Sequence, residues 1–206
     1  MTVGPHPKPW PEDSRYDREL LENGDTRNVV DKYRYWTRDA IILDLDQYRH
    51  PFHVAVENWE HDFNIGTVIR NANAFLAKAV HIVGKRRWNR RGAMVTDRYQ
   101  HILHHPSVHD FVEWAQAEDV EIIGIDNIPG STPIETSLLP SNSVLVFGQE
   151  GPGLSEEMIE EFENQTGISV SMIKLDDAGS VLDYLIKNKG TNDIDLAIGL
   201  DNTYLS

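Results

Sequence analysis

The sequence predicts an α/β protein with a mostly parallel sheet flanked by helices. Short apolar runs at 53–57, 80–83, 120–125 and 144–147 indicate buried strands, and segments with helical spacing lie between them. This alternation is typical of parallel sheets, whose ligands bind at the carboxyl ends of the strands. The chain of 206 residues is long enough to bury the core of one such domain.

The N-terminal part of the chain divides into two segments. Residues 1–27 are rich in proline, charge and turn formers, which predicts an irregular N-terminal arm. Apolar residues then recur at a spacing of three to four, which predicts helix between 28 and 46. We expect one domain over 28–160, followed by an atypical tail over 161–206 that either completes this domain or is appended to it.

The first predicted strand, 53–57, leads into a helix over 65–76. Ile65, Ala72 and the pair Phe75-Leu76 are expected to face inward, and Asn64 precedes the helix as a candidate N-cap. Arg70 then lies about one and a half turns into this helix. A second strand, 80–83, follows.

A dense cluster of cations follows the second strand. The net charge of −14 argues against indiscriminate nucleic-acid binding, but phosphate binding needs only local positive potential. A tryptophan within the cluster can stack on a base. A solvated basic loop is the simpler alternative, but the clustering favours RNA or DNA binding by Lys85, Arg86, Arg87, Trp88, Arg90 and Arg91.

Four histidines raise the question of a metal site, because histidines four residues apart on a helix can bind zinc. They are His101, His104, His105 and His109. Pro106 interrupts any helix there, and no acidic or thiol ligand lies in a matching register, so we expect structural or surface histidines and no metal. The absence of cysteine excludes disulfides and thiolate chemistry. The N-terminus lacks the apolar segment of a signal peptide and no run could span a membrane, so we expect a cytoplasmic protein.

A glycine-rich turn follows the last predicted strand. Helix 108–117 and strand 120–125 precede it, and Ser155 is positioned to cap the acidic helix that begins after it. A strand that ends in glycines and opens a helix can present backbone groups to a ligand, although it can also be a tight turn without one. Gly148, Gly151 and Gly153 do not form the G-x-G-x-x-G pattern of dinucleotide-binding proteins.

Two blocks of this sequence together resemble the SpoU family of RNA 2′-O-ribose methyltransferases, of the knotted SPOUT class. The blocks 64–75 (Asn-Ile-Gly-Thr-Val-Ile-Arg-Asn-Ala-Asn-Ala-Phe) and 147–155 (Phe-Gly-Gln-Glu-Gly-Pro-Gly-Leu-Ser) stand in the family's order. The resemblance covers about residues 25–160. One departure is Gln149, where many members have asparagine.

The resemblance implies a trefoil-knot fold, a homodimer and methylation of tRNA or rRNA with S-adenosylmethionine. Arg70 would act in the active site across the dimer interface, with Asn64 supporting it and Glu150 holding the loop or the substrate. The cofactor would lie on the loops after the strands that end at Ile125 and Phe147. Its binding residues would be Ile125, Asp126, Phe147, Gly148, Gln149, Glu150, Gly151 and Leu154.

The family's third motif has no clear counterpart, since 166–174 shows only a Ser-Val-Ser echo of it. Residues 162–206 instead resemble a fragment of thiamine-binding solute-binding proteins of ABC transporters, with strands 168–175 and 195–199 around helix 179–189. A chimera and a divergent tail are both open. Three functions follow as alternatives: a methyltransferase with activity impaired by the tail, a catalytically silent RNA-binding protein, and a thiamine binder using Asp201 and Asn202.

Overall fold

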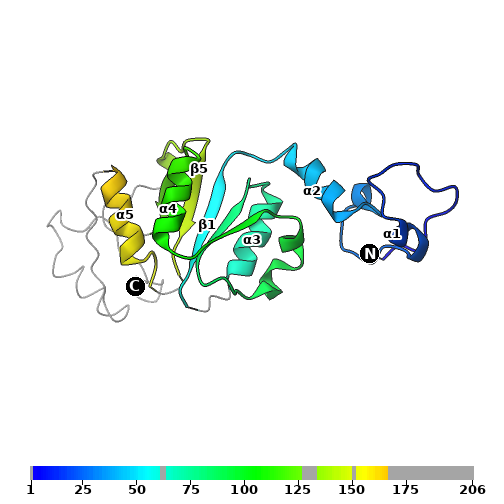
Figure 1. Cartoon of the computed structure of the whole chain (residues 1–206), viewed down its shortest axis with the longest axis horizontal. Coiled ribbons are helices and arrows are strands. Elements are labelled where there is room, and N and C mark those ends of the chain that lie inside the picture. Colours follow the sequence, from blue (N-terminus) through cyan, green and yellow to red (C-terminus); the bar gives the residue numbers. More distant parts are fainter. Residues whose placement is uncertain (1, 61–63, 127–133, 150–151, 167–206) are drawn as a thin grey trace, which may run out of the picture.

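A five-stranded, entirely parallel sheet forms the centre of the molecule (Figure 1). The structure is a computed structural model that describes residues 2–60, 64–126, 134–149 and 152–166. The strand order is β3-β2-β1-β5-β4. The strands are β1 His53–Asn58, β2 Val80–Gly84, β3 Ile102–His105, β4 Glu121–Ile125 and β5 Ser143–Phe147.

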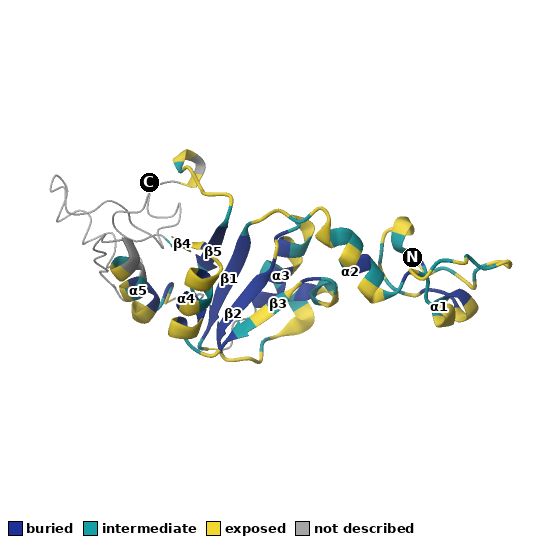
Figure 2. Cartoon of the chain, turned by 45° about the horizontal axis from the view of Figure 1, so that its top comes forward, coloured by how far each residue is buried: buried dark blue, intermediate teal, exposed yellow. Residues whose placement is uncertain are grey.

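Helices cover both faces of the sheet. Helix α3, Ile65–Ala74, packs on one face, and α4, Val108–Ala117, and α5, Glu156–Thr166, pack on the other. Every residue of β1 and β2 is buried, as Figure 2 shows. Burial on both faces explains why these strands read as continuous apolar runs. Short 3₁₀ helices complete the layers: η2 Arg90–Ala93, η3 Thr96–Arg98 and η4 Ile134–Thr136.

The predicted α/β class and the four predicted strands are confirmed, but two of the predicted details differ from the structure. The histidine segment forms strand β3 rather than an interrupted helix, with His104 and His105 paired to β2. Helix α3 ends at Ala74, and Phe75 is 71% exposed, so its predicted inward orientation is wrong. The predicted elements of the tail, and the knot, lie outside the described residues.

The N-terminal segment forms a small structured unit at one end of the molecule (Figure 1). It contains helix α1, Arg18–Asn23, so the predicted arm is not wholly irregular. Two short helices, η1 Asp31–Tyr33 and α2 Arg38–Asp46, stand where helix was predicted over 28–46. The break between them lies at Tyr35, whose φ of 63° is left-handed.

A buried ion pair holds the N-terminal unit together. Asp25 is fully buried and accepts hydrogen bonds from the Arg27 side chain and from the backbone N–H groups of Arg27 and Tyr35. Burial alone would raise the pKa of Asp25, but these hydrogen bonds outweigh it and lower the pKa to about 2. Removing either partner would leave an uncompensated buried charge.

Arg49 joins this unit to the sheet. Its guanidinium donates to the backbone oxygens of Ala77 and Tyr99 and to Oε1 of Gln100, at 2.6 to 3.0 Å. Its Nε also donates to Asp46 at the end of α2. Because one planar cation binds groups from α2 and from the segments that precede β2 and β3, it links the N-terminal unit to the start of both strands.

Three buried histidines form a hydrogen-bonded row across β1, β2 and β3. His53 Nδ1 lies 2.9 Å from His81 Nε2, and His81 Nδ1 lies 2.8 Å from His105 Nε2. Trp114 of α4 packs against all three rings. Burial, with a smaller contribution from neighbouring cationic groups, lowers the pKa of His53 to about 4 and that of His81 to about 2. The row is therefore neutral and part of the core at neutral pH.

Candidate functional site

The strand order reverses between β1 and β5. The strands β2 and β3 continue outward on one side of β1, while β5 and β4 lie on the other side. Ligands of open parallel sheets bind outside the carboxyl ends of the strands at such a point. The pairing register places Val56, Phe147 and Ile125 side by side at this edge. The two loops on which the resemblance places the cofactor, after Ile125 and Phe147, thus meet the loop that follows β1 at one place.

The β5–α5 loop, residues 148–155, folds back tightly on itself. Gln149 and Gly153 exchange two backbone hydrogen bonds of 2.9 Å. A Cβ at Gly148 would lie 2.0 Å from the carbonyl carbon of Gly153, so no side chain fits there. Gly153 has a φ of +75°, which favours glycine. Two predicted cofactor residues of this loop, Glu150 and Gly151, lie outside the described residues.

Side chains from three strand ends hold the β5–α5 loop. Gln149 Oε1 accepts hydrogen bonds from the backbone N–H groups of Trp59 and Glu60, at 3.1 and 2.6 Å. Asp126 Oδ2 accepts from the backbone N–H of Leu154 at 2.8 Å. Asp126 and Gln149, both predicted to bind cofactor, therefore also shape the loop. The side-chain amide of Gln149 makes these two bonds at the position where the resemblance leads one to expect asparagine.

Glu57 is the third of these side chains. It is fully buried at the end of β1 and accepts hydrogen bonds from Trp59 Nε1, Ser155 N and Ser155 Oγ, at 2.6 to 2.8 Å. Ser155 Oγ also accepts from the backbone N–H of Met158, which confirms Ser155 as the cap of α5. The carboxylate thus lies at the N-terminal end of a helix, where the backbone favours an anion.

The basic loop, residues 85–91, leaves the neighbouring strand β2. All four of its arginines and Lys85 are exposed, so its charge is available to a ligand. Trp88 is only partly exposed and packs against the core, and the Arg90 guanidinium lies 5.5 Å from its ring centroid. Arg90 also pairs with Asp97 at 3.5 Å. Trp88 therefore anchors the basic loop to the core, and part of its ring remains accessible to a ligand.

Asn58 holds the start of the basic loop. This residue is fully buried, and its Nδ2 donates to the backbone oxygens of Lys85 and Arg87 at 2.6 and 2.9 Å. The backbone N–H of Lys85 donates in turn to the carbonyl of Asn58 at 2.8 Å. The end of β1 is thus bound directly to both loops.

Arg70 lies on the exposed side of α3, after its buried residues Ile65 and Ile69. Asn64 occupies the N-cap position as predicted and accepts backbone hydrogen bonds from Thr67 and Val68 through its carbonyl, but its side chain makes no capping bond. Both side chains are exposed to solvent. An exposed arginine can reach a phosphate or another subunit without first breaking a bond inside the core.

Candidate metal ligands were compared within the described residues, 2–60, 64–126, 134–149 and 152–166. In those ranges no group of three or more histidine, cysteine, aspartate or glutamate side chains is placed to hold a metal ion. The same ranges contain no helix long and apolar enough to cross a bilayer.

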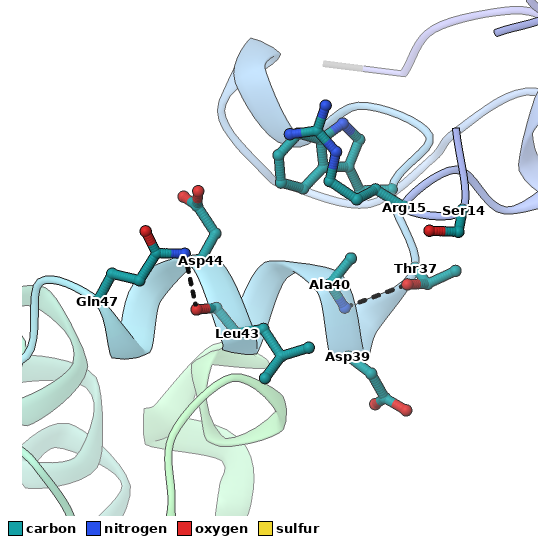
Figure 3. A pocket seen from close by; sticks show the side chains of 9 residues that line it. Ser14, Arg15, Thr37, Asp39, Ala40, Leu43, Asp44 and Gln47 are labelled. Atoms are coloured by element: carbon teal, nitrogen blue, oxygen red, sulfur yellow. Dashed lines mark hydrogen bonds between the residues drawn. The ribbon is translucent and has the colours of Figure 1, made fainter. Parts of the chain in front are cut away.

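A pocket of about 340 Å³ lies in the N-terminal unit rather than at the sheet edge (Figure 3). Arg15 and α2 form its walls, and the Arg15 guanidinium lies 4.4 Å from the centroid of the Trp36 ring. Because Trp36 is 4% exposed, its face is already covered by the arginine. None of the residues predicted for cofactor or RNA binding lines this pocket.

From the sequence alone, no role was assigned to Glu57 and Asn58. Their partners are distant in the chain, since Glu57 binds a serine 98 residues away. A signal was nevertheless present: two polar residues directly follow a continuous apolar strand, Val-Ala-Val-Glu-Asn. Buried charges need partners, so such residues mark a strand end that other segments must reach.

The fold and the position of these loops define an all-parallel α/β protein with a candidate ligand site at the reversal point of its sheet. Residues 51–173 match the model of the SpoU rRNA Methylase family, which is more than half of the chain, and the chain belongs to this family. The match begins later than the predicted resemblance and extends beyond it, through the segment with the Ser-Val-Ser echo. A comparison with curated proteins gave no significant match.

One of three similar solved structures supports the same fold. A TrmH/SpoU tRNA modifying enzyme of A. aeolicus shares 15% identity and a TM-score of 0.51, covering 68% of this chain and 74% of that one. The AdoMet complex of the SpoU methyltransferase AviRb from Streptomyces viridochromogenes shares 19% identity, with a TM-score of 0.49 and coverage of 70% and 59%. An AdoMet-bound rRNA methyltransferase from Sinorhizobium meliloti shares 24% identity, with a TM-score of 0.48 and coverage of 65% and 52%. This chain spans little more than half the length of the last two.

Proposed function

We propose that this protein is an S-adenosylmethionine-dependent RNA 2′-O-ribose methyltransferase acting on tRNA or rRNA in the cytoplasm. The observation that carries the proposal is the match of residues 51–173 to the SpoU rRNA Methylase family. The position of the β5–α5 loop at the reversal point of the sheet agrees with it. The AdoMet complexes of AviRb and of the S. meliloti enzyme support the choice of cofactor.

The residues at the sheet edge fit such a cofactor. Ile125 and Phe147 are partly exposed and would supply apolar surface for a purine, Leu154 lies buried behind the loop, and the backbone of the surrounding loops would supply hydrogen-bonding groups. S-adenosylmethionine would supply an electrophilic methyl group on its sulfonium. The protein's part is to hold the ribose 2′ oxygen in line with that methyl and to help it lose its proton.

Arg70 is the residue proposed to act on the substrate. An arginine stays protonated throughout the physiological range, so it is a poor base. It is well suited to bind the phosphate beside the reacting ribose and to stabilise charge that develops on the 2′ oxygen. Its exposure on α3 is compatible with action across a homodimer interface, and Asn64 and Glu150 are proposed as its neighbours in the assembled site.

The basic loop is proposed to bind RNA through phosphates. Its exposed cations are Lys85, Arg86, Arg87, Arg90 and Arg91, while Arg90 partly covers Trp88. Affinity from such contacts is electrostatic and falls steeply with salt. No metal is needed in this mechanism, since the charge is supplied by arginines.

Calorimetric titration of S-adenosylmethionine, followed by methylation of tRNA and rRNA, tests the proposal. We expect micromolar binding and methyl transfer that protects one ribose linkage from alkaline cleavage. Methylation on a base instead would contradict the 2′-O assignment. A folded protein that binds RNA but gives no heat with the cofactor would support the second candidate, a catalytically silent RNA-binding protein. The weak third motif in 166–174 is what favours that candidate.

A further inference from the structure

Two consecutive residues at the end of β1 bind two different loops. Glu57 and Asn58 are both 0% exposed, and successive residues of a strand point to opposite faces. Glu57 binds the start of α5, and Asn58 binds the start of the basic loop. We infer that Glu57 and Asn58 are positioning residues that separately hold the cofactor loop and the RNA loop, an inference that rests on the proposed function for the identity of the two ligands.

Glu57 is suited to its part because only a carboxylate accepts from all three of its donors. Trp59 Nε1, Ser155 N and Ser155 Oγ all donate to its two oxygens. No cation of the described chain lies within ion-pair distance of it, so these donors and the end of α5 compensate the buried charge. An amide in its place would direct an N–H group at one of the donors.

The same contacts explain how Glu57 reaches the cofactor loop. Ser155 follows Leu154 directly, and Leu154 is itself bound by Asp126 through its backbone N–H. Fixing Ser155 from β1 and Leu154 from β4 sets the path of the chain as it leaves the β5–α5 loop. Loss of the Glu57 contact would remove the support at Ser155 and leave the support at Leu154 in place.

Asn58 is suited to its part because one nitrogen carries two N–H donors. Both are used, on the backbone oxygens of Lys85 and Arg87. These oxygens lie two residues apart, so the amide bends the chain at the point where the cations begin. The spacing of Arg86 and Arg87 toward a phosphate backbone depends on this bend.

Three isosteric or reduced variants separate these roles. Glu57→Gln keeps the shape of the side chain but removes one acceptor. Asn58→Leu keeps the branching of the side chain but removes both donors, without adding charge near the basic loop. Val56→Ala removes buried apolar contacts from the same strand, at a residue 3% exposed, and leaves every hydrogen bond of Glu57 and Asn58 to the two loops in place, so it is the matched control for loss of stability.

The measurements are backbone hydrogen exchange by mass spectrometry, calorimetric titration of S-adenosylmethionine, and RNA affinity by filter binding. For Glu57→Gln we expect exchange to rise about tenfold in the peptide around 152–158, with cofactor affinity about tenfold lower and RNA affinity within twofold of wild type. For Asn58→Leu we expect the reverse, with faster exchange over 85–91 and about tenfold weaker RNA binding. Val56→Ala should lower the melting temperature without a local change in either segment.

The inference fails if either variant alters both segments equally, or if neither segment changes beyond what Val56→Ala produces. Hydrogen exchange decides this without any ligand. If the wild-type protein binds no cofactor, the proposed function fails, and the exchange pattern still tests the two positioning roles. If a variant does not fold, it is replaced by Glu57→Asp or Asn58→Gln, which keeps the carboxylate or the amide but changes its reach. Faster exchange confined to 152–158 for Glu57→Asp, or to 85–91 for Asn58→Gln, then sustains the inference.

Discussion

The β5–α5 loop and the basic loop leave neighbouring parts of the same sheet edge but are held in opposite ways. The β5–α5 loop is closed by its own backbone and bound by side chains from β1 and β4. The basic loop is bound at its start by Asn58, and its cations extend into solvent. One loop is built for a fixed shape and the other for a local charge.

This difference separates two kinds of recognition. A small ligand needs groups placed within a fraction of an ångström, which rigid support provides. A phosphate chain needs positive potential, which long exposed side chains supply at many geometries. The two loops should therefore respond to different changes, and four further predictions test that.

The largest effect is expected from Gly148→Ala. The added methyl would overlap the backbone of Gly153, so the loop must open. We expect cofactor binding to fall by more than about 100-fold and the melting temperature to drop by several degrees, because the backbone contact itself is lost. Calorimetric titration and thermal unfolding measure both.

Gly4→Ala is the control for this change, since nothing lies within 4 Å of a Cβ at that position. It should behave as wild type. A Gly148→Ala protein with unchanged cofactor affinity would show that the closed loop is not what binds the ligand.

The next effect is expected from Arg70→Ala, which touches neither loop. If Arg70 stabilises charge at the 2′ oxygen, methylation should fall about 100-fold, chiefly in kcat, with cofactor affinity unchanged. Steady-state kinetics and calorimetry separate these quantities. The exposed Arg98→Ala should retain full activity, and an equally large loss there would point to a general charge effect instead.

Smaller changes are expected from the basic loop. Arg86→Ala and Arg87→Ala should each weaken RNA binding several-fold and reduce the salt slope by about one, with no change in cofactor affinity. RNA binding measured at several salt concentrations gives both values. Arg38→Ala, in the N-terminal unit, is the matched control. Unchanged binding in the quadruple variant of Arg86, Arg87, Arg90 and Arg91 would remove the RNA role of this loop.

The smallest effect concerns the core and should leave both loops unchanged. Because the folded protein holds His53 neutral, with a pKa near 4 against an unfolded value of about 6.5, stability is complete above pH 6.5 and is lost as the pH falls toward 4. The slope should be at most about 1.4 kcal/mol per pH unit for each such histidine.

Urea unfolding at several pH values measures this slope. The His53→Phe variant should show a shallower dependence between pH 6.5 and 4, while the exposed His109→Gln should keep that of wild type. An unaltered slope in His53→Phe would assign the acid sensitivity to other groups.

The two loops and the strands between them differ in how well their sequence predicts their structure. Four strands of the sheet were predictable because a strand that is buried on both faces has a continuous apolar sequence, such as Val-Leu-Val-Phe. Strand β3 was missed because only one of its residues, His105, is buried, and that burial depends on Phe111 and Trp114 of a later helix. The β5–α5 loop and the basic loop were singled out from the sequence by their glycines and cations, which act locally.

The supports of those loops could not be predicted in the same way. Glu57 and Asn58 act through partners 98 and 27 residues away, and only the strand order brings them together. Asp126 was predicted for cofactor binding from the resemblance, but its bond to Leu154 depends on β4 lying beside β5. Such long-range contacts leave no periodic trace in the sequence.

The strand order also determines the order in which the strands can join the sheet as the protein folds. Strand β5 is made last of the five, yet it is inserted between β1 and β4. Bridging it to β1 closes a long stretch of chain, and such non-local pairing is slow. During synthesis the nascent chain can already expose its basic loop, while the β5–α5 loop has no framework until β5 has entered the sheet. A newly made chain therefore exposes its cluster of cations before the β5–α5 loop can take its final shape.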